Sequence, residues 1–177
     1  MQLIGRFSIF LFLTFCQFNY GQTFQYAYYE GDAVPFKEVN QVIQDVNGYV
    51  WLATEQGLFR FDGKTFEDYN IALQSKSIRA FVQWDDSTIL FANDLGIHSI
   101  SYVDGKPEVN DFINTQEARY PTLLYKHTKD RLWVGQMDSS IQMFEKNKST
   151  GKVFNVGRKK KTTHIYFGED AFGTIWS

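Results

Sequence analysis

Few residues in this chain have types and spacings that indicate catalysis. Its three histidines, His98, His127 and His164, lack the short His-x-x-x-His spacing that places two imidazoles on one helix face to hold a metal ion. Acidic residues are plentiful, but sequence alone places no two of them at the separation that a glycosidase requires. There is also no Gly-x-Ser-x-Gly nucleophile elbow. The sequence therefore predicts no catalytic residue, no metal site and no cofactor.

Net charge argues against one class of partner. The formal net charge is −2 at pH 7, whereas a protein that binds nucleic acid needs a basic excess to neutralise phosphates. One basic run, residues 158–161, could contact anionic glycans or lipid headgroups, or could be an ordinary solvated loop. We expect no nucleic-acid partner.

Residues 1–21 have the pattern of a secretory signal peptide. Arg6 precedes an apolar run at 7–15, which is shorter than the roughly 20 residues that a membrane-spanning helix needs. Cleavage after residue 21 would remove the single cysteine, Cys16, and with it any disulfide or thiolate metal site. Two alternatives stay open, a buried N-terminal strand and lipid attachment at Cys16.

One short pattern, Asp-x-x-Gly-x-x-Trp, recurs along the chain. Two full copies of the pattern end at Trp51 and Trp176, and two weaker copies lie between them, centred on Leu90 and Trp133. We call the residue at the Trp position of each copy its anchor, and successive anchors are about 40 residues apart. A period of about 40 residues with four short strand-like runs per unit is typical of a β-propeller. Helical solenoids share the period but need long stretches of 3.6-residue periodicity, which this chain lacks. The full copies are Asp45, Gly48 and Trp51, and Asp170, Gly173 and Trp176.

Each unit is expected to form a four-stranded antiparallel sheet. In the first unit, residues 47–48 and 62–63 are tight-hairpin signals because Asn, Asp and Gly tolerate positive φ, and Gly57 ends the turn between the second and third strands. Later units are expected to have longer outer loops near 104–105 and 146–151. The Trp should fill the space between adjacent sheets, and the Asp should accept backbone N–H bonds in its turn.

The predicted fold class is therefore all-β: β-propeller blades made of four-stranded antiparallel sheets, in an incomplete ring of about three and a half blades. The expected units lie within residues 22–177. Because such a ring leaves open strand edges and unburied sheet faces, we expect an N-terminal fragment of a larger protein. The units cover about 39–70, 78–112, 121–156 and 163–177.

The first unit resembles the two-component regulator propeller repeat, in the pattern Ile-x-Asp-x-x-Gly-x-x-Trp-x-x-Thr-x-x-Gly-Leu-x-x-Phe at residues 43–61. The resemblance extends over about 39–176. It is weaker in the middle units, where Trp84 and His127 occupy the places of the motif Asp. This family builds the exported sensor region of membrane histidine kinases, including the hybrid sensors of Bacteroidetes.

The resemblance implies a function and a location. It implies a sensor propeller on the periplasmic or extracellular side of a bacterial membrane, which responds to an extracellular glycan fragment and takes part in signal transduction. Kinase activity would belong to the membrane and kinase regions that follow in the family, not to this chain. Expected partners are an oligosaccharide, those C-terminal regions and a second receptor copy.

Ligands of propellers usually meet the loops at one end of the central channel, so the turns between second and third strands are the expected binding site. Their polar side chains could hydrogen-bond sugar hydroxyls, or could be ordinary solvated loops. Two other functions stay open, a secreted propeller enzyme that acts on polysaccharide and an adhesion or scaffold propeller. The candidate ligand-binding residues are Glu55, Gln56, Asn93, Asp94, Gln136 and Asp138.

Overall fold

Antiparallel sheets follow one another along the chain, each with its strands in sequence order. The computed structural model describes residues 27–114, 116–127, 131–145, 148–155, 168–170 and 174–176. The expected signal peptide and Cys16, the basic run at 158–161, His164 and Gly173 lie outside the described residues. The described residues form three four-stranded sheets and a two-stranded one, which confirms the predicted all-β propeller architecture.

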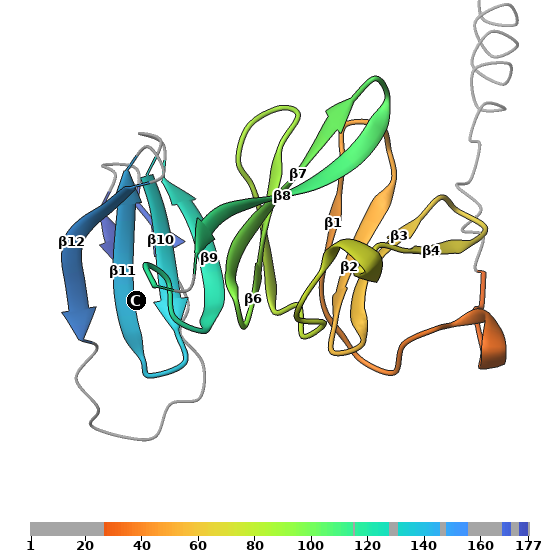
Figure 1. Cartoon of the computed structure of the whole chain (residues 1–177), viewed down its shortest axis with the longest axis horizontal. Coiled ribbons are helices and arrows are strands. Elements are labelled where there is room, and N and C mark those ends of the chain that lie inside the picture. The colour runs from red at the N-terminus through yellow and green to blue at the C-terminus, as the bar shows by residue number, and fades with distance from the viewer. Residues whose placement is uncertain are drawn as a thin grey trace, which may run out of the picture.

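The three complete sheets lie side by side along the long axis of the molecule (Figure 1). A single-turn 3-10 helix, η1 (Gly31–Ala33), precedes the first strand, and a second, η2 (Asn70–Ala72), lies between the first and second sheets. The first sheet contains β1 (Val39–Gln44), β2 (Val50–Thr54), β3 (Gly57–Phe61) and β4 (Phe66–Asp68). The second contains β5 (Ala80–Gln83), β6 (Ile89–Asn93), β7 (Gly96–Val103) and β8 (Lys106–Asn114). The third contains β9 (Pro121–His127), β10 (Arg131–Gln136), β11 (Ser140–Glu145) and β12 (Lys148–Asn155). The two-stranded sheet pairs β13 (Gly168–Glu169) with β14 (Ile175–Trp176).

The sequence repeat corresponds to a repeat in strand register. Each anchor residue of a second strand pairs with the first-strand residue the same number of positions earlier. The four pairs are Trp51 with Ile43, Leu90 with Val82, Trp133 with Tyr125, and Trp176 with Gly168.

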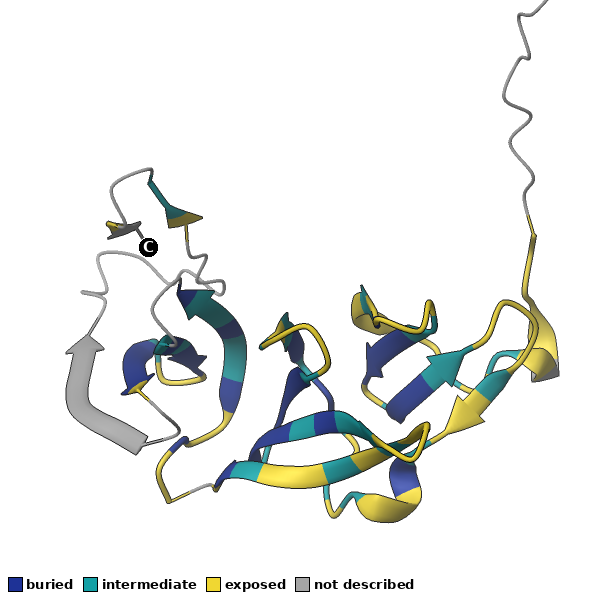
Figure 2. Cartoon of the chain, turned by 90° about the horizontal axis from the view of Figure 1, so that it is seen from above, coloured by how far each residue is buried: buried dark blue, intermediate teal, exposed yellow. Residues whose placement is uncertain are grey.

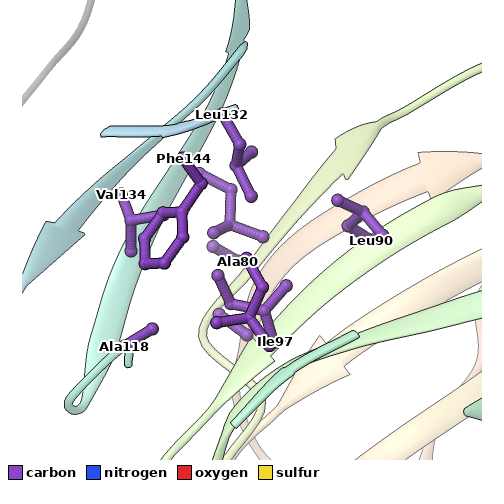
Figure 3. Close-up of a cluster of buried hydrophobic side chains, with 10 residues drawn as sticks. Ala80, Leu90, Ile97, Ala118, Leu132, Val134 and Phe144 are labelled. Carbon is purple, nitrogen blue, oxygen red and sulfur yellow. The ribbon is translucent and has the colours of Figure 1, made fainter. Parts of the chain in front are cut away.

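Adjacent sheets bury apolar side chains against one another, and alternate residues of one strand serve two different neighbours. Trp51, Ala53 and Leu58 of the first sheet pack against one face of the second. The opposite face of the second sheet packs against the third (Figure 3). Strands β2, β6 and β11 are buried at nearly every position, and buried residues are dark blue in Figure 2. The face toward the first sheet carries Phe81, Ile89, Phe91 and Ile100; the face toward the third carries Ala80, Leu90, Ala92 and Ile97.

An N-terminal segment covers part of the other face of the first sheet. The ring of Phe36 packs against Phe59, and Tyr29 lies edge-on to Phe61 and Phe66. The Tyr29 hydroxyl also donates to the carbonyl of Gly63 at 2.9 Å. Residues 27–38 thus supply apolar cover to the outer strands of this sheet.

The expectation of longer outer loops in the later units is wrong. β7 and β8 are joined by a two-residue turn at Asp104 and Gly105, whose φ values of 50° and 75° suit a tight hairpin. β11 pairs as far as Glu145 with Lys148, so that turn is short as well. The extra residues lengthen the strands instead, because antiparallel pairing satisfies backbone groups that a loop would leave to water.

Asp45 stabilises the first hairpin and also bonds this hairpin to the second sheet. Its carboxylate accepts the backbone N–H groups of Asn47 and Tyr49 at 2.9 Å each. It also accepts Trp51 Nε1–H at 2.8 Å, and the hydroxyl of Tyr102 from the second sheet. Since Asp45 is only 8% exposed, water cannot replace these bonds.

Replacing Asp45 should therefore cost more than replacing an exposed turn aspartate. Asp62 accepts the backbone N–H groups of Lys64 and Thr65 at 2.7 Å each, but it is exposed. We expect Asp45→Ala to lower the free energy of unfolding by about 2–3 kcal/mol and Asp62→Ala to lower it by clearly less. Chemical denaturation measures both, and equal losses would contradict the role given to Asp45.

The turn between β2 and β3 requires glycine at 57. Gly57 has φ +139°, and a Cβ there would lie 1.8 Å from the side-chain oxygen of Asn70. That side chain accepts Leu58 N–H at 3.0 Å and donates to the Gln56 carbonyl at 3.2 Å, so it cannot move aside without losing both bonds.

Gly57→Ala can be compared with Gly63→Ala. Gly63 has φ +96° but open space around its Cα, so its replacement introduces only backbone strain, about 1 kcal/mol. We expect Gly57→Ala to cost about 1–3 kcal/mol more because of the clash. In an Asn70→Ala background the additional cost should disappear in denaturation measurements. A cost that persists there would show that the clash is not with Asn70.

Candidate functional site

The expected ligand-binding residues lie at one edge of the sheets for a topological reason. Strands alternate in direction, so the second and fourth strands of each sheet end at the same edge. The turns between second and third strands therefore share that edge with the connections between sheets, which run through residues 70–79 and 114–120.

Two of the six expected residues are buried supports. Asn93 is 0% exposed, and its side-chain oxygen accepts Leu95 N–H at 2.8 Å and lies 3.0 Å from His98 Nε2. Gln136 is 8% exposed and donates to the side chain of Gln142 at 2.8 Å. Both stabilise the turns from behind, so a ligand at the surface would not reach them directly.

Glu55 and Gln56 bind other parts of the chain. The carboxylate of Glu55 accepts Ser77 Oγ–H at 2.7 Å and Asn40 Nδ2–H at 3.0 Å. These two bonds, that from Ser77 first, lower the pKa of Glu55. The side-chain oxygen of Gln56 accepts the backbone N–H of Lys37 at 2.9 Å. The first turn is thus connected to β1, to the segment between the first two sheets and to the N-terminal segment.

Asp94 and Asp138 lie in the other two turns. Asp94 Oδ1 accepts hydrogen bonds from Arg79 Nη2 at 2.9 Å and Nε at 3.2 Å. Its other oxygen lies 3.5 Å from Ser75 Oγ. Asp138 is exposed and accepts the backbone N–H of Ser140 at 2.8 Å. Of the six expected residues, Asp94 is the one that lines the hollow described next.

A surface hollow of about 790 Å³ lies between the two connections and the β6–β7 turn. Its size falls within the range of small-molecule sites, roughly 300–1,000 Å³. Most of the residues that line it have polar or charged side chains, and we call it the connection hollow. It is lined by Gln74, Ser75, Lys76, Asp94, Leu95, Gln116, Arg119 and Tyr120.

Tyr120 is the most unusual residue of the connection hollow. Its φ is +44°, a region that bulky side chains rarely adopt, and it precedes Pro121, which further restricts the backbone. Its carbonyl accepts Met137 N–H at 3.1 Å, which holds the strained residue in place. The side chain is 55% exposed, so a flat aromatic surface borders the hollow. Strain of this kind is concentrated at binding and active sites.

A second hollow of about 440 Å³ adjoins the first and shares Gln74 and Leu95 with it. His98 lines it, with Nδ1 2.9 Å from Asp111 and Nε2 bonded to Asn93. Burial lowers the pKa of His98, and Asp111 opposes that shift. Because both ring nitrogens already have partners, His98 is a bridge between β6, β7 and β8.

The arrangement suits reversible binding. The connection hollow offers hydrogen-bond donors, acceptors and an aromatic face. In the part of the chain that the structure describes, no group of three or more His, Cys, Asp or Glu residues could hold a metal ion. No helix there is long and apolar enough to cross a membrane.

Lys76, Arg119 and Tyr120 were not among the residues predicted from the sequence, because the predicted residues were all in turns within a sheet. The connections between sheets reach the same edge, as the order of strands requires. Tyr120 before Pro121 was the available signal, since that pair marks a constrained extended or turn segment.

Comparisons with known proteins bear on the fold. No protein-family model matches the chain, and a search of curated proteins found no match. Among solved structures, virginiamycin B lyase from Staphylococcus aureus, in a catalytically inactive form with quinupristin, has a TM-score of 0.57 at 15% identity, over 81% of this chain and 50% of that one. The extracellular domain assigned to the hybrid two component system BT3049 of B. thetaiotaomicron has a TM-score of 0.54 at 20% identity, over 78% and 20%. A streptogramin B lyase has 0.51 at 17% identity, over 76% and 46%.

These similarities show that the chain has the fold of a β-propeller. The chain spans half of the length of virginiamycin B lyase and a fifth of that of the sensor domain. The structures it resembles thus include both an enzyme and a receptor domain.

The lowered pKa of Glu55 predicts a pH dependence. A carboxyl group with a pKa below its ordinary 4.5 stabilises the fold above that pH and loses this contribution as pH falls through the folded-state pKa. We expect the wild type to exceed Glu55→Gln in free energy of unfolding at pH 7, with the difference shrinking toward about pH 3. Urea denaturation at both pH values measures it. A difference that does not change with pH would contradict the assigned bonds.

Proposed function

We propose that this chain is the N-terminal part of the exported sensor propeller of a membrane two-component receptor, and that its connection hollow binds an extracellular glycan fragment. The observation that carries the proposal is the exposed, strained Tyr120 beside a hollow of about 790 Å³ that is lined mostly by residues with polar or charged side chains. A tyrosine side chain has an apolar ring and a polar hydroxyl, so it suits contact with a sugar ring, which also has both apolar and polar parts.

Two further observations support the receptor assignment. The repeat at residues 43–61 resembles the two-component regulator propeller repeat, and the solved extracellular domain of a hybrid two-component system shares the fold. In such a receptor the ligand would have to bind one of two conformations more tightly in order to shift their populations. Histidine kinase activity would reside outside this chain.

A second candidate is a secreted propeller enzyme, since lyases also share the fold. The described residues give this candidate little support. His98 lines a hollow, but its ring nitrogens are bonded to Asp111 and Asn93, and it is 9% exposed. A general base must instead reach a substrate proton.

The coding sequence beyond Ser177 separates the two candidates. A membrane helix followed by kinase motifs would support the receptor, and a stop codon after the last sheet of a closed ring would favour the enzyme.

Tyr120 provides the direct test of the binding site. A thermal-shift screen of the complete exported region against glycan fragments should find a saccharide that raises Tm, because a ligand that binds only the folded state stabilises it. For that saccharide, Tyr120→Ala should weaken binding about tenfold, equivalent to about 1.4 kcal/mol.

Met137→Ala is the matched control. Met137 is 56% exposed, close to the 55% of Tyr120, and it lies at the same edge of the sheets without lining the hollow. Its replacement should leave the affinity unchanged in calorimetry. Equal effects of the two substitutions, or no saccharide bound at all, would count against the proposed site.

A further inference from the structure

The residues that line the connection hollow carry more positive charge than negative charge. Two cations, Lys76 and Arg119, line it, and both are exposed. Among the described residues, neither takes part in an ion pair, in contrast to Arg60, Arg79 and Arg131. These two cations are therefore available to a ligand.

The anion of the lining is already neutralised. Asp94 is bonded to Arg79 through two guanidinium nitrogens, at 2.9 and 3.2 Å, and it is only partly exposed. Glu117 belongs to the same connection as Arg119 but does not line the hollow. Its backbone N–H is bonded to Asn114, the last residue of β8. The ligand-facing charge of the hollow is thus positive.

The two cations come from different connections. Lys76 lies on the connection between the first and second sheets, and Arg119 on that between the second and third. Tyr120 directly follows Arg119, so one cation and the aromatic ring are adjacent in the chain. An extended ligand in the hollow would have cations supplied from two connections and a ring surface next to one of them.

We infer that the saccharide bound here is anionic, with its carboxylate or sulfate group held by Lys76 and Arg119 while a pyranose ring lies on Tyr120. This inference rests on the proposed function and specifies its ligand class. A guanidinium group matches the planar pair of oxygens of a carboxylate or the oxygens of a sulfate, and a lysine ammonium adds a point charge. Gln74 and Gln116 supply amide groups that can bond to neutral hydroxyls of the same saccharide.

Matched probes test the charge. We would measure binding of the complete exported region to tetragalacturonic acid and to its full methyl ester, which keeps the rings and removes the charges. A second pair, a chondroitin sulfate tetrasaccharide and its desulfated form, separates sulfate from carboxylate. At least one acidic probe should bind more than tenfold more tightly than its partner with fewer charges. That preference should weaken as salt is raised, because exposed charges are screened.

Substitutions of the two cations test whether they hold the acidic group of the probe. Lys76→Gln and Arg119→Gln should each weaken binding of the acidic probe at least threefold and leave Tm unchanged, because both side chains are exposed. Lys64→Gln, an exposed lysine in the β3–β4 turn, should have no effect. Arg119→Lys should restore part of the affinity, which would separate charge from simple loss of the side chain.

The outcomes distinguish the two levels of the proposal. If neutral saccharides bind as tightly as acidic ones, or if the variants leave acid binding intact, the anionic class is wrong and the glycan-sensing function stands. If no saccharide binds, either among these probes or in the thermal-shift screen of glycan fragments, the proposed function fails and this inference fails with it.

Discussion

The fold depends on one constraint, the need of each sheet to bury both of its faces against neighbours. Residues at equivalent positions of successive units bury these faces. Phe81, Ile89, Phe91 and Ile100 of the second sheet face the first, and the corresponding residues of the third sheet, Leu124, Leu132, Val134 and Phe144, face the second. Because side chains alternate along a strand, the residues between them serve the opposite neighbour. A strand such as β6 is therefore apolar at nearly every position, as strands buried on both sides are.

The same constraint explains why the repeat is degenerate in the second unit. In the first unit Trp51 is buried and its Nε1–H requires the carboxylate of Asp45. In the second unit both residues are replaced together, with Leu90 at the position of the Trp and Trp84 at that of the Asp. Trp84 packs against the cluster that contains Leu90, so apolar volume is retained without a buried donor. The turn keeps a carboxylate one residue later, where Asp85 accepts the N–H groups of Ser87 and Thr88.

This difference shows what sequence could and could not predict. The fold followed from the period and from the apolar character of the second strands, because both reflect packing between sheets and need no exact residue. The extent of the outer strands did not follow, because Asp104-Gly105 marks a turn equally well with long or short strands around it. The connection hollow was missed for another reason. It depends on which loops approach each other in space. The positive φ of Tyr120 is held by a tertiary bond to Met137, and its only local sequence signal is the following proline.

If the chain is part of a receptor, as we propose, the position of the connection hollow determines what a ligand would act on. The walls of the hollow come from the β6–β7 turn and from the two connections that join the three sheets. Asn93 fixes the first connection by donating to the carbonyl of Ser75 at 3.3 Å. On the other side, the Tyr120 carbonyl is bonded to the β10–β11 turn of the third sheet. A ligand that bridges Lys76 and Arg119 would therefore be coupled to both interfaces between the sheets. Closely packed interfaces change between discrete arrangements more readily than they deform continuously. The binding free energy of such a ligand would therefore favour one relative arrangement of the sheets over another. Loops on a rigid scaffold commonly carry function, and in this chain the loops that could bind a ligand are also those that connect the scaffold.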